Sequence, residues 1–373
     1  MTGPLTPRET WRSDSRGMSK IESELVKLEH ALALAQAEGE TNLPARTNVL
    51  NLVVYVKDEA ELQQACDAVM HLGGRHPSRT IYVIPGTSVS GEVEAELRAH
   101  CLAGTESAPQ ICVEEIRLRT GTFRSGNLPE LLSPLLIADL PTFAWCPVLT
   151  SDSGSVLAAL AELADHVVVD SSGARNTGEI LRTLAPFGRQ LTDFAWLRLL
   201  PWCELTAQFF DPEASRRYLD QLTMLQIEYA APTMTNAVLY AGWLSARLGW
   251  EPFPEDRAPL VRFFRRNADP GQYALAQLFP TSEPLPGRRT IQGIVLQAER
   301  PSTTPAKFQM RLGPTGTSMQ TLSRLPNGRQ SVRTAPLPSN DDSALLATAL
   351  DHLEPIRVYQ SALANAVKMV SPS

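Results

Sequence analysis

Residues 46–85, RTNVLNLVVYVKDEAELQQACDAVMHLGGRHPSRTIYVIP, decide the fold of the N-terminal part of this chain. The near-continuous apolar run Leu50–Val56 is typical of a strand that is covered on both faces. Apolar residues then recur at three- and four-residue spacing from Leu62 to Leu72, which predicts a helix with one buried face. Arg79–Ile84 predicts a second strand beside the first, so we expect a βαβ unit.

The alternation of helices and strands continues beyond this unit and predicts a doubly wound, mostly parallel sheet. A helix is expected near Ser90–Leu102, and strands are expected near Gln110–Leu118, Thr142–Val148 and His166–Asp170. A long, aromatic-rich helix over Thr192–Phe210 is expected to begin the second half of the chain.

The C-terminal half has a different pattern, in which short strands are joined by turns rich in Gly, Pro and Asn before a helical segment, 340–369. The predicted fold class is therefore α/β, with an N-terminal doubly wound, mostly parallel sheet domain followed by an α+β domain with an antiparallel sheet. The predicted bounds are 1–18 for a disordered arm, 19–45 for an amphipathic helix and linker, 46–190 for the α/β domain and 191–373 for the α+β domain. The apolar stripe of the N-terminal helix packs either on the chain's own core, which we favour, or on another subunit.

The composition narrows the classes of partner. At 373 residues two domains are expected, and a net charge of −6 with dispersed Lys and Arg argues against nucleic acid as a partner. No apolar run approaches the roughly 20 residues that span a bilayer. The basic residues near the N-terminus are not followed by the apolar segment of a secretory signal. We therefore expect no membrane partner and a cytoplasmic location.

No familiar catalytic motif is present. The sequence lacks GxxxxGK[ST], a GxGxxG after a strand, HExxH and GxSxG, and its six histidines are scattered. We therefore expect no catalytic residues, no cofactor and no metal site. The cysteines lack CxxC spacing, which favours reduced thiols in core positions over a disulfide framework. They are Cys66, Cys101, Cys112, Cys146 and Cys203.

The first polar candidate is the segment that contains His76, Ser78 and Arg79, at the N-terminal end of the second strand of the βαβ unit. An arginine there is suited to a bidentate contact with phosphate or carboxylate, and the histidine and serine add hydrogen bonds. The alternative is structural: Pro77 fixes the turn and Arg79 pairs with a nearby acid. Ligand sites of open α/β sheets usually lie at the carboxyl ends of strands, which supports the structural alternative.

The second candidate is the loop Asp170–Asn176, which follows a predicted strand at its carboxyl end. Ser171, Ser172 and Arg175 are small or cationic residues that suit an anion at the start of the next helix. The structural alternative, which we favour, is a helix N-cap and a connecting loop.

The third candidate is the aromatic segment that contains Trp196, Arg198, Trp202 and Glu204. Tryptophan and arginine are enriched at the energetic centres of protein interfaces, so this segment is a candidate partner contact. An aromatic core with a buried ion pair has the same residue types. The sequence leaves both interpretations open.

Six blocks of the chain share one resemblance. In chain order they are RTNVLNLVVY, HPSRTIYV, PLLIADLPTFAW, HVVVDSS, DFAWLRLLPWCELTAQFFDP and AGWLSARLGW. Together they resemble the OpcA family of glucose-6-phosphate dehydrogenase assembly proteins. The resemblance implies a non-catalytic assembly factor and allosteric activator of glucose-6-phosphate dehydrogenase that supports NADPH production in the oxidative pentose phosphate pathway. It also implies the dehydrogenase as partner, and a small anionic effector is possible besides.

One departure and two alternatives qualify the resemblance. Cyanobacterial members of the family are linked to thioredoxin control through cysteines toward the C-terminus, whereas this chain has no cysteine after Cys203. One alternative is a sugar-phosphate or nucleotide-binding enzyme that uses the 170–176 loop. The other is a general scaffold or chaperone that binds through Trp196, Trp202 and the N-terminal helix.

Overall fold

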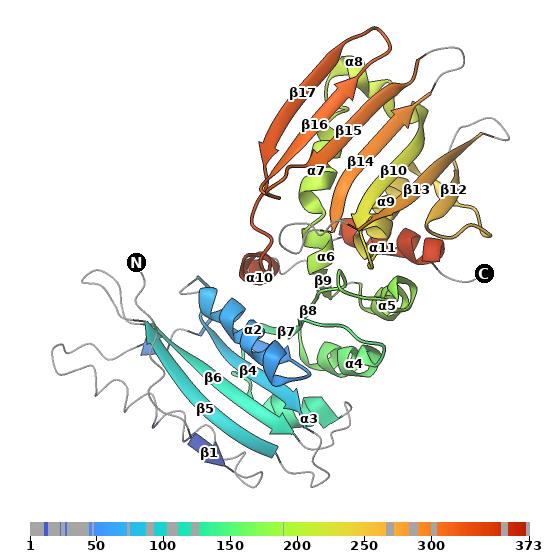
Figure 1. Ribbon diagram of the computed structural model, residues 1–373. Helices are drawn as coiled ribbons and strands as arrows, with labels where there is room; N and C mark the ends of the chain where they lie inside the picture. Colours follow the sequence, from blue (N-terminus) through green and yellow to red (C-terminus); the bar gives the residue numbers. More distant parts are fainter. Residues whose placement is uncertain are drawn as a thin grey trace. The chain divides into compact units, whose positions relative to one another are not determined.

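The computed structural model describes residues 11–13, 23, 27, 45–46, 48–72, 75–86, 93–102, 111–120, 127–188, 190–265, 272–282, 290–299, 304–351 and 357–370 (Figure 1). The chain divides into two compact units, and each is described by itself. Unit 1 comprises Met1–Val148, Asp152–Val169 and Asp342–Leu353, and unit 2 comprises Leu149–Ser151, Asp170–Asp341 and Glu354–Ser373. The domain bounds expected from the sequence stay a prediction.

The βαβ unit expected from residues 46–85 is confirmed. Strand β3 (Leu50–Tyr55), helix α2 (Glu59–His71) and strand β4 (Ser78–Pro85) follow one another, and the two strands pair in parallel. Both strands are buried along almost their whole length, as their continuous apolar runs require. Asp58 caps α2 by accepting a hydrogen bond from the backbone N–H of Glu61, at 2.9 Å.

A mostly parallel sheet forms the centre of unit 1, as predicted. Its strand order is β1-β5-β6-β4-β3-β7-β8, with β2 beside β6. The strands besides β3 and β4 are β1 (Trp11–Ser13), β2 (Ala45–Arg46), β5 (Val93–Leu102), β6 (Ile111–Thr120), β7 (Thr142–Cys146) and β8 (His166–Val169). Among the described residues, the helices of this unit include, besides α2, α3 (Leu128–Leu132), α4 (Ser153–Leu163) and α10 (Asp342–Asp351).

One element of unit 1 differs from the prediction. The segment Ser90–Leu102 was expected to be helical, but Val93–Leu102 forms strand β5, antiparallel to β6. Glu, Ala, Leu and Arg favour helices locally, yet pairing with β6, the next strand in the chain, decides the conformation here. Glu96 on β5 accepts a hydrogen bond from Arg119 on β6 at 3.4 Å, which ties the two strands through their side chains.

The N-terminal predictions fall mostly outside the described residues. Within the arm expected to be disordered the structure describes Trp11–Ser13, which form β1 and pair with β5. Within the amphipathic helix expected in residues 19–45 it describes Ser23 and Lys27, which are helical and exposed. The remainder of both segments lies outside the described residues.

Unit 2 contains the antiparallel sheet that the sequence predicts. Over the described residues the strand order is β11-β12-β13-β10-β14-β15-β16-β17, and every pair of neighbours is antiparallel except β10 with β13. The strands are β10 (Leu222–Ala230), β11 (Glu251–Pro252), β12 (Leu260–Phe264), β13 (Tyr273–Thr281), β14 (Ile291–Ala298), β15 (Ala306–Leu312), β16 (Ser318–Arg324) and β17 (Gln330–Pro336). Figure 1 shows the helices of this unit on one side of the sheet.

The predicted long helix Thr192–Phe210 is wrong, because the segment begins in a strand and its helical part is broken after Leu197. It consists of β9 (Leu191–Asp193), α6 (Phe194–Leu197) and α7 (Leu200–Gln208). Asp193 starts α6 as an N-cap, since its side chain accepts a hydrogen bond from the N–H of Ala195 at 2.9 Å. Pro201 lies in the first turn of α7, the part of a helix that tolerates a residue without an N–H.

The remaining described helices of unit 2 are α5 (Thr177–Leu184), α8 (Glu213–Arg216), α9 (Thr235–Leu248) and α11 (Arg357–Val370). Two of them, α9 and α11, pack closely together. Helix α9 contacts α11 at Gly242, where an added Cβ would lie 2.3 Å from the backbone oxygen of Ala362. A residue without a side chain is therefore required at Gly242 for the two helices to approach this closely.

Candidate functional site

The segment containing His76, Ser78 and Arg79 lies at the start of β4 in unit 1. Arg79 is 1% exposed, its Nε pairs with the carboxylate of Glu114 on β6, and its Nη1 donates to the backbone oxygen of Leu135 at 3.0 Å. The Ser78 hydroxyl lies 3.0 Å from the hydroxyl of Thr80. This buried ion pair is the arrangement that the structural interpretation of Arg79 predicts.

His76 is the most solvent-accessible of these three residues. Its Nε2 lies 3.1 Å from a carboxylate oxygen of Asp351 on α10, and Arg75 pairs with the same carboxylate. Burial lowers the pKa of the His76 imidazole, while the Asp351 carboxylate opposes that shift. The arrangement joins the start of β4 to α10 within unit 1.

A connected group of buried polar side chains in unit 2 begins directly after the end of β8, and we call it the Asp193 network. Its members are Asp170, Ser171, Ser172, Asp193, Arg198 and Tyr359. They come from the 170–176 loop, from the start and end of α6, and from α11. Two of the segments that the sequence singles out are therefore joined in one structure.

Asp193 is the centre of the network. Its carboxylate accepts hydrogen bonds from the Ser171 N–H at 3.0 Å, the Ser171 hydroxyl at 2.5 Å, the Ala195 N–H at 2.9 Å and the Tyr359 hydroxyl at 3.1 Å. Burial raises the pKa of Asp193 to about 6, although the bonds from Ser171 oppose the shift. Burial and the neighbouring Asp193 carboxylate also raise the pKa of the Tyr359 phenol.

Arg198 and Asp170 form the second half of the network. Arg198 Nη1 donates to Asp170 Oδ1 at 2.8 Å and lies 3.0 Å from the Ser172 hydroxyl oxygen, which itself donates to Asp170 at 2.6 Å. The backbone oxygen of Ser172 accepts a hydrogen bond from Thr233 at 2.7 Å. Arg198 is 5% exposed, and its guanidinium needs such partners because an unpaired buried charge costs several kcal/mol.

The burial of the Asp193 network limits the chemistry available to it. Asp193 is 0% exposed, so its carboxylate does not meet a ligand from solvent while unit 2 is folded. What the network does is connect the loop after β8 with α6 and α11. Its physical role in this structure is to hold those segments together.

The other predicted site residues divide into buried and exposed positions. Trp196 is 1% exposed and packs against the Tyr359 ring at a centroid distance of 5.7 Å, and Trp202 on α7 is also buried. Arg175 and Glu204 are exposed. The surroundings of Trp196, Trp202 and Arg198 match an aromatic core with a buried ion pair. The suggested roles of these residues in contacts with a partner or an anion stay predictions.

The 170–176 loop forms the helix cap that the structural interpretation predicts. Asn176 is the N-cap of α5, and its side chain accepts a hydrogen bond from the Glu179 N–H at 3.2 Å. Its Nδ2 donates to the Glu179 carboxylate at 2.9 Å, so Asn176 and Glu179 are joined by two reciprocal hydrogen bonds.

Several members and supports of the Asp193 network were not predicted from the sequence. Asp193 and Tyr359 were not singled out, and neither were Thr233 and Asn236, whose side chains donate to Ser172 and Ala195 backbone oxygens. A signal existed for Asp193, which precedes an apolar helix in the manner of an N-cap. No local signal identifies Tyr359, which lies 166 residues further along the chain.

The described residues also bear on metals, thiols and membranes. Within the described ranges, no group of three or more His, Cys, Asp or Glu residues is arranged to hold a metal ion. Cys66, Cys146 and Cys203 are free and buried, and burial raises the pKa of the Cys146 thiol to about 12. None of the helices, over the part of the chain that the structure describes, has the length and apolar character needed to cross a membrane.

The solved structures that match most of this chain are distant from it. A mutant form of KijD10, a 3-ketoreductase from Actinomadura kijaniata, has a TM-score of 0.48 at 12% identity, over 87% of this chain and 97% of that one. UDP-N-acetylglucosamine 3-dehydrogenase GnnA from Acidithiobacillus ferrooxidans has a TM-score of 0.39 at 12% identity, over 86% and 95% of the two chains. Similarity at this level transfers no function.

Sequence relatives are more informative. A family model described as the N-terminal domain of a glucose-6-phosphate dehydrogenase subunit matches residues 69–186, and one described as the C-terminal domain of that subunit matches residues 189–363. The chain therefore belongs to the OpcA family of glucose-6-phosphate dehydrogenase subunits, as the resemblance in its sequence blocks indicates.

Curated relatives carry the same family name. A protein of Synechocystis sp., named putative OxPP cycle protein OpcA, is 29% identical over 194 residues, which are 51% of this chain and 41% of the relative. The protein of that name from Nostoc punctiforme is 31% identical over 182 residues, which are 48% of this chain and 39% of the relative. The matched segments thus cover less than half the length of either relative.

Proposed function

We propose that this chain is a non-catalytic assembly factor and allosteric activator of glucose-6-phosphate dehydrogenase. It acts in the cytoplasm and supports NADPH production in the oxidative pentose phosphate pathway. The observation that carries the proposal is the match of two consecutive domains, residues 69–186 and 189–363, to the two domains of a glucose-6-phosphate dehydrogenase subunit.

The geometry supports a non-catalytic role for the polar segments that the sequence singles out. The groups with acid, base or cationic character in the Asp193 network are buried and bonded to one another. Arg79 is likewise buried and paired with Glu114. General acid–base catalysis requires a group within hydrogen-bond reach of a substrate proton, whereas these groups form hydrogen bonds and ion pairs with other residues of the protein.

The proposal is tested by titrating this chain into the cognate glucose-6-phosphate dehydrogenase while the rate and the mass of the complex are followed together. We expect a rise in kcat/KM for glucose 6-phosphate or a shift in the oligomer distribution of the enzyme. A partner shifts such an equilibrium only through different affinities for its states. The expected coupling is about 1–3 kcal/mol, or roughly 5- to 150-fold.

Surface variants refine the test. Arg175 and Glu204 are the exposed members of the predicted contact set, so Arg175→Ala and Glu204→Ala report on contact without disturbing the core. Glu251→Ala, also at an exposed position, is the matched control for Glu204→Ala. If the wild-type chain forms no complex at micromolar concentrations and changes neither rate nor mass, the assembly role is refuted. Turnover of a sugar phosphate by the chain alone would instead favour the enzyme alternative.

A further inference from the structure

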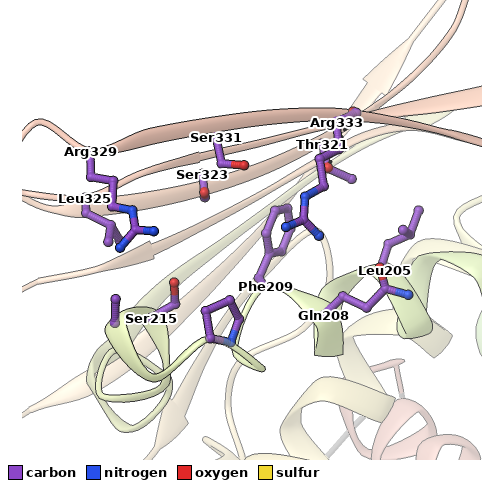
Figure 2. Close-up of a pocket in the computed structure, with 12 residues that line it drawn as sticks. Leu205, Gln208, Phe209, Ser215, Thr321, Ser323, Leu325, Arg329, Ser331 and Arg333 are labelled. Atoms are coloured by element: carbon purple, nitrogen blue, oxygen red, sulfur yellow. Dashed lines mark hydrogen bonds between the residues drawn. The ribbon is translucent and has the colours of Figure 1, made fainter.

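A small pocket in unit 2 lies between the helical layer and the hairpin formed by β16 and β17. Its cavity volume is about 110 Å³. One wall comes from the end of α7 and the start of α8, where Phe209 supplies an apolar surface. The opposite wall comes from the hairpin and carries Arg329 and Arg333 (Figure 2).

The hairpin's register explains why its polar side chains gather on this wall. Successive side chains of a strand point to opposite faces, so Arg329, Ser331 and Arg333 share one face of the sheet. Ser331 lies opposite Ser323 on β16, and Arg333 lies opposite Thr321, which places the hydroxyls of both strands beside the arginines. Figure 2 shows both arginine side chains directed from the hairpin toward the helices.

The turn that joins the two strands holds this arrangement in place. Gly328 has a φ of 82°, a conformation that glycine adopts without strain. The Leu325 N–H donates to the Arg329 backbone oxygen at 2.9 Å, and the Gly328 N–H donates to the Leu325 backbone oxygen at 3.0 Å. Arg329 is therefore set at a defined position immediately before β17.

The arginines of this pocket differ from the buried arginines of the molecule in their charge balance. Neither the Arg329 nor the Arg333 guanidinium forms an ion pair with any residue that the structure describes, and no Asp or Glu lines the pocket. Arg79 and Arg198, by contrast, each have a carboxylate partner. The pocket wall thus carries two positive charges, hydroxyl groups and no acidic side chain.

We propose that this pocket binds a phosphate group, either as inorganic phosphate or as the phosphate of a small ester. Guanidinium groups match phosphate oxygens through paired N–H donors, and the hydroxyls of Ser323 and Ser331 add donors at the same wall. Pockets that enclose a whole drug-sized ligand have volumes of about 300–1,000 Å³, and this pocket is smaller. One anionic group therefore enters it, and the rest of an ester lies at the mouth. This inference goes beyond the proposed function and does not depend on it.

The experiment uses the full chain without the dehydrogenase. Inorganic phosphate, glucose 6-phosphate and glucose are titrated separately at constant ionic strength, and binding is followed by calorimetry. We expect saturable binding of one or both phosphate compounds and none of glucose. If glucose 6-phosphate binds more tightly than inorganic phosphate, the ligand is an ester, and equal affinities indicate the free ion.

Variants assign the binding to the pocket. Arg333→Gln is expected to weaken phosphate binding about tenfold, the effect of losing one charged hydrogen-bonding group, and Arg329→Gln combined with Arg333→Gln to abolish it. Arg324→Gln is the matched control, because Arg324 is exposed on β16 but does not line the pocket. Arg333→Lys, which keeps the charge and loses the paired donors, is expected to be intermediate. Absence of saturable binding, or equal weakening by Arg324→Gln, would refute the proposal whatever the dehydrogenase experiment shows.

Discussion

The Asp193 network and the hairpin pocket place the same residue types, arginine and serine, in opposite circumstances. In the network Arg198 is buried and lies 2.8 Å from Asp170, and its hydroxyl neighbours bond to carboxylates. In the pocket Arg329 and Arg333 are exposed and pair with no described acid. A buried charge without a partner in the protein costs free energy, whereas an exposed charge is solvated by water and stays available for a ligand.

An arginine beside serines has no fixed role in this protein. The loop Asp170–Asn176 and the hairpin both combine small polar residues with arginine, so residue type does not separate structure from binding. The location of the nearest carboxylate does. Asp170 precedes Arg198 by 28 residues, and the fold brings them together, whereas the fold brings no acid to the lining of the pocket.

The largest expected effect is the removal of the carboxylate that Arg198 requires. Asp170→Ala leaves a buried guanidinium without its ion-pair partner, which costs about 3–5 kcal/mol. The thermal midpoint is expected to fall by roughly 6–20 °C, measured by circular dichroism. Asp220→Ala, at an exposed position, is the matched control, and its change is expected to stay within about 0.5 kcal/mol. Equal shifts for the two variants would show that the network does not stabilise the fold.

The second effect is a pH dependence that originates at Asp193. Its folded-state pKa of about 6 lies above the ordinary value of 3.8, so the folded protein holds a proton that the unfolded chain releases between these values. The stability from this proton is fully present below about pH 4 and is lost as the pH rises through 6. The loss amounts to at most about 3 kcal/mol.

Asp193→Asn isolates that contribution, because asparagine does not titrate. The free energy of unfolding of wild type and variant is measured by urea denaturation at several values between pH 4 and pH 7. We expect the difference, variant minus wild type, to rise over this range and to level off above about pH 6. Asp170 and Tyr359 face Asp193 but are present in both proteins, so their effects on the free energy of unfolding largely cancel in the difference. A flat difference would show that Asp193 titrates at its ordinary value.

Local patterns in the sequence were enough to predict the elements that build the parallel sheet. Other elements were mispredicted or missed because pairing between strands decides their conformation. The βαβ unit at 46–85 was predictable because its strands are continuously apolar and its helix has a 3.6-residue period. The segment Val93–Leu102 has the composition of a helix, but it pairs with β6 on one side and with β1 on the other and is therefore a strand. Strand β13 was not predicted for a similar reason, because its conformation depends on pairing with β10 on one side and with β12 on the other.

The candidate sites were predictable to the same extent. Ser171, Ser172 and Arg198 could be identified from short segments, and the structure joins them. Their role depends on Asp193 and Tyr359, and the contact with Tyr359 spans 166 residues of chain. The hairpin pocket was not predicted at all, because it requires the register of β16 and β17 and the position of α7.

The smallest expected effect on stability belongs to the pocket, and it completes the comparison. The double variant Arg329→Gln, Arg333→Gln removes two exposed guanidinium groups that form no ion pair with a described residue. Its free energy of unfolding is therefore expected to stay within about 0.5 kcal/mol of wild type. Arg198→Gln, which removes one guanidinium from the network, serves as the contrasting variant and should destabilise by several kcal/mol. Urea denaturation of all three proteins in the absence of phosphate provides the measurement. If the double variant lost as much stability as Arg198→Gln, the pocket arginines would be structural, and the distinction between the two regions would fail.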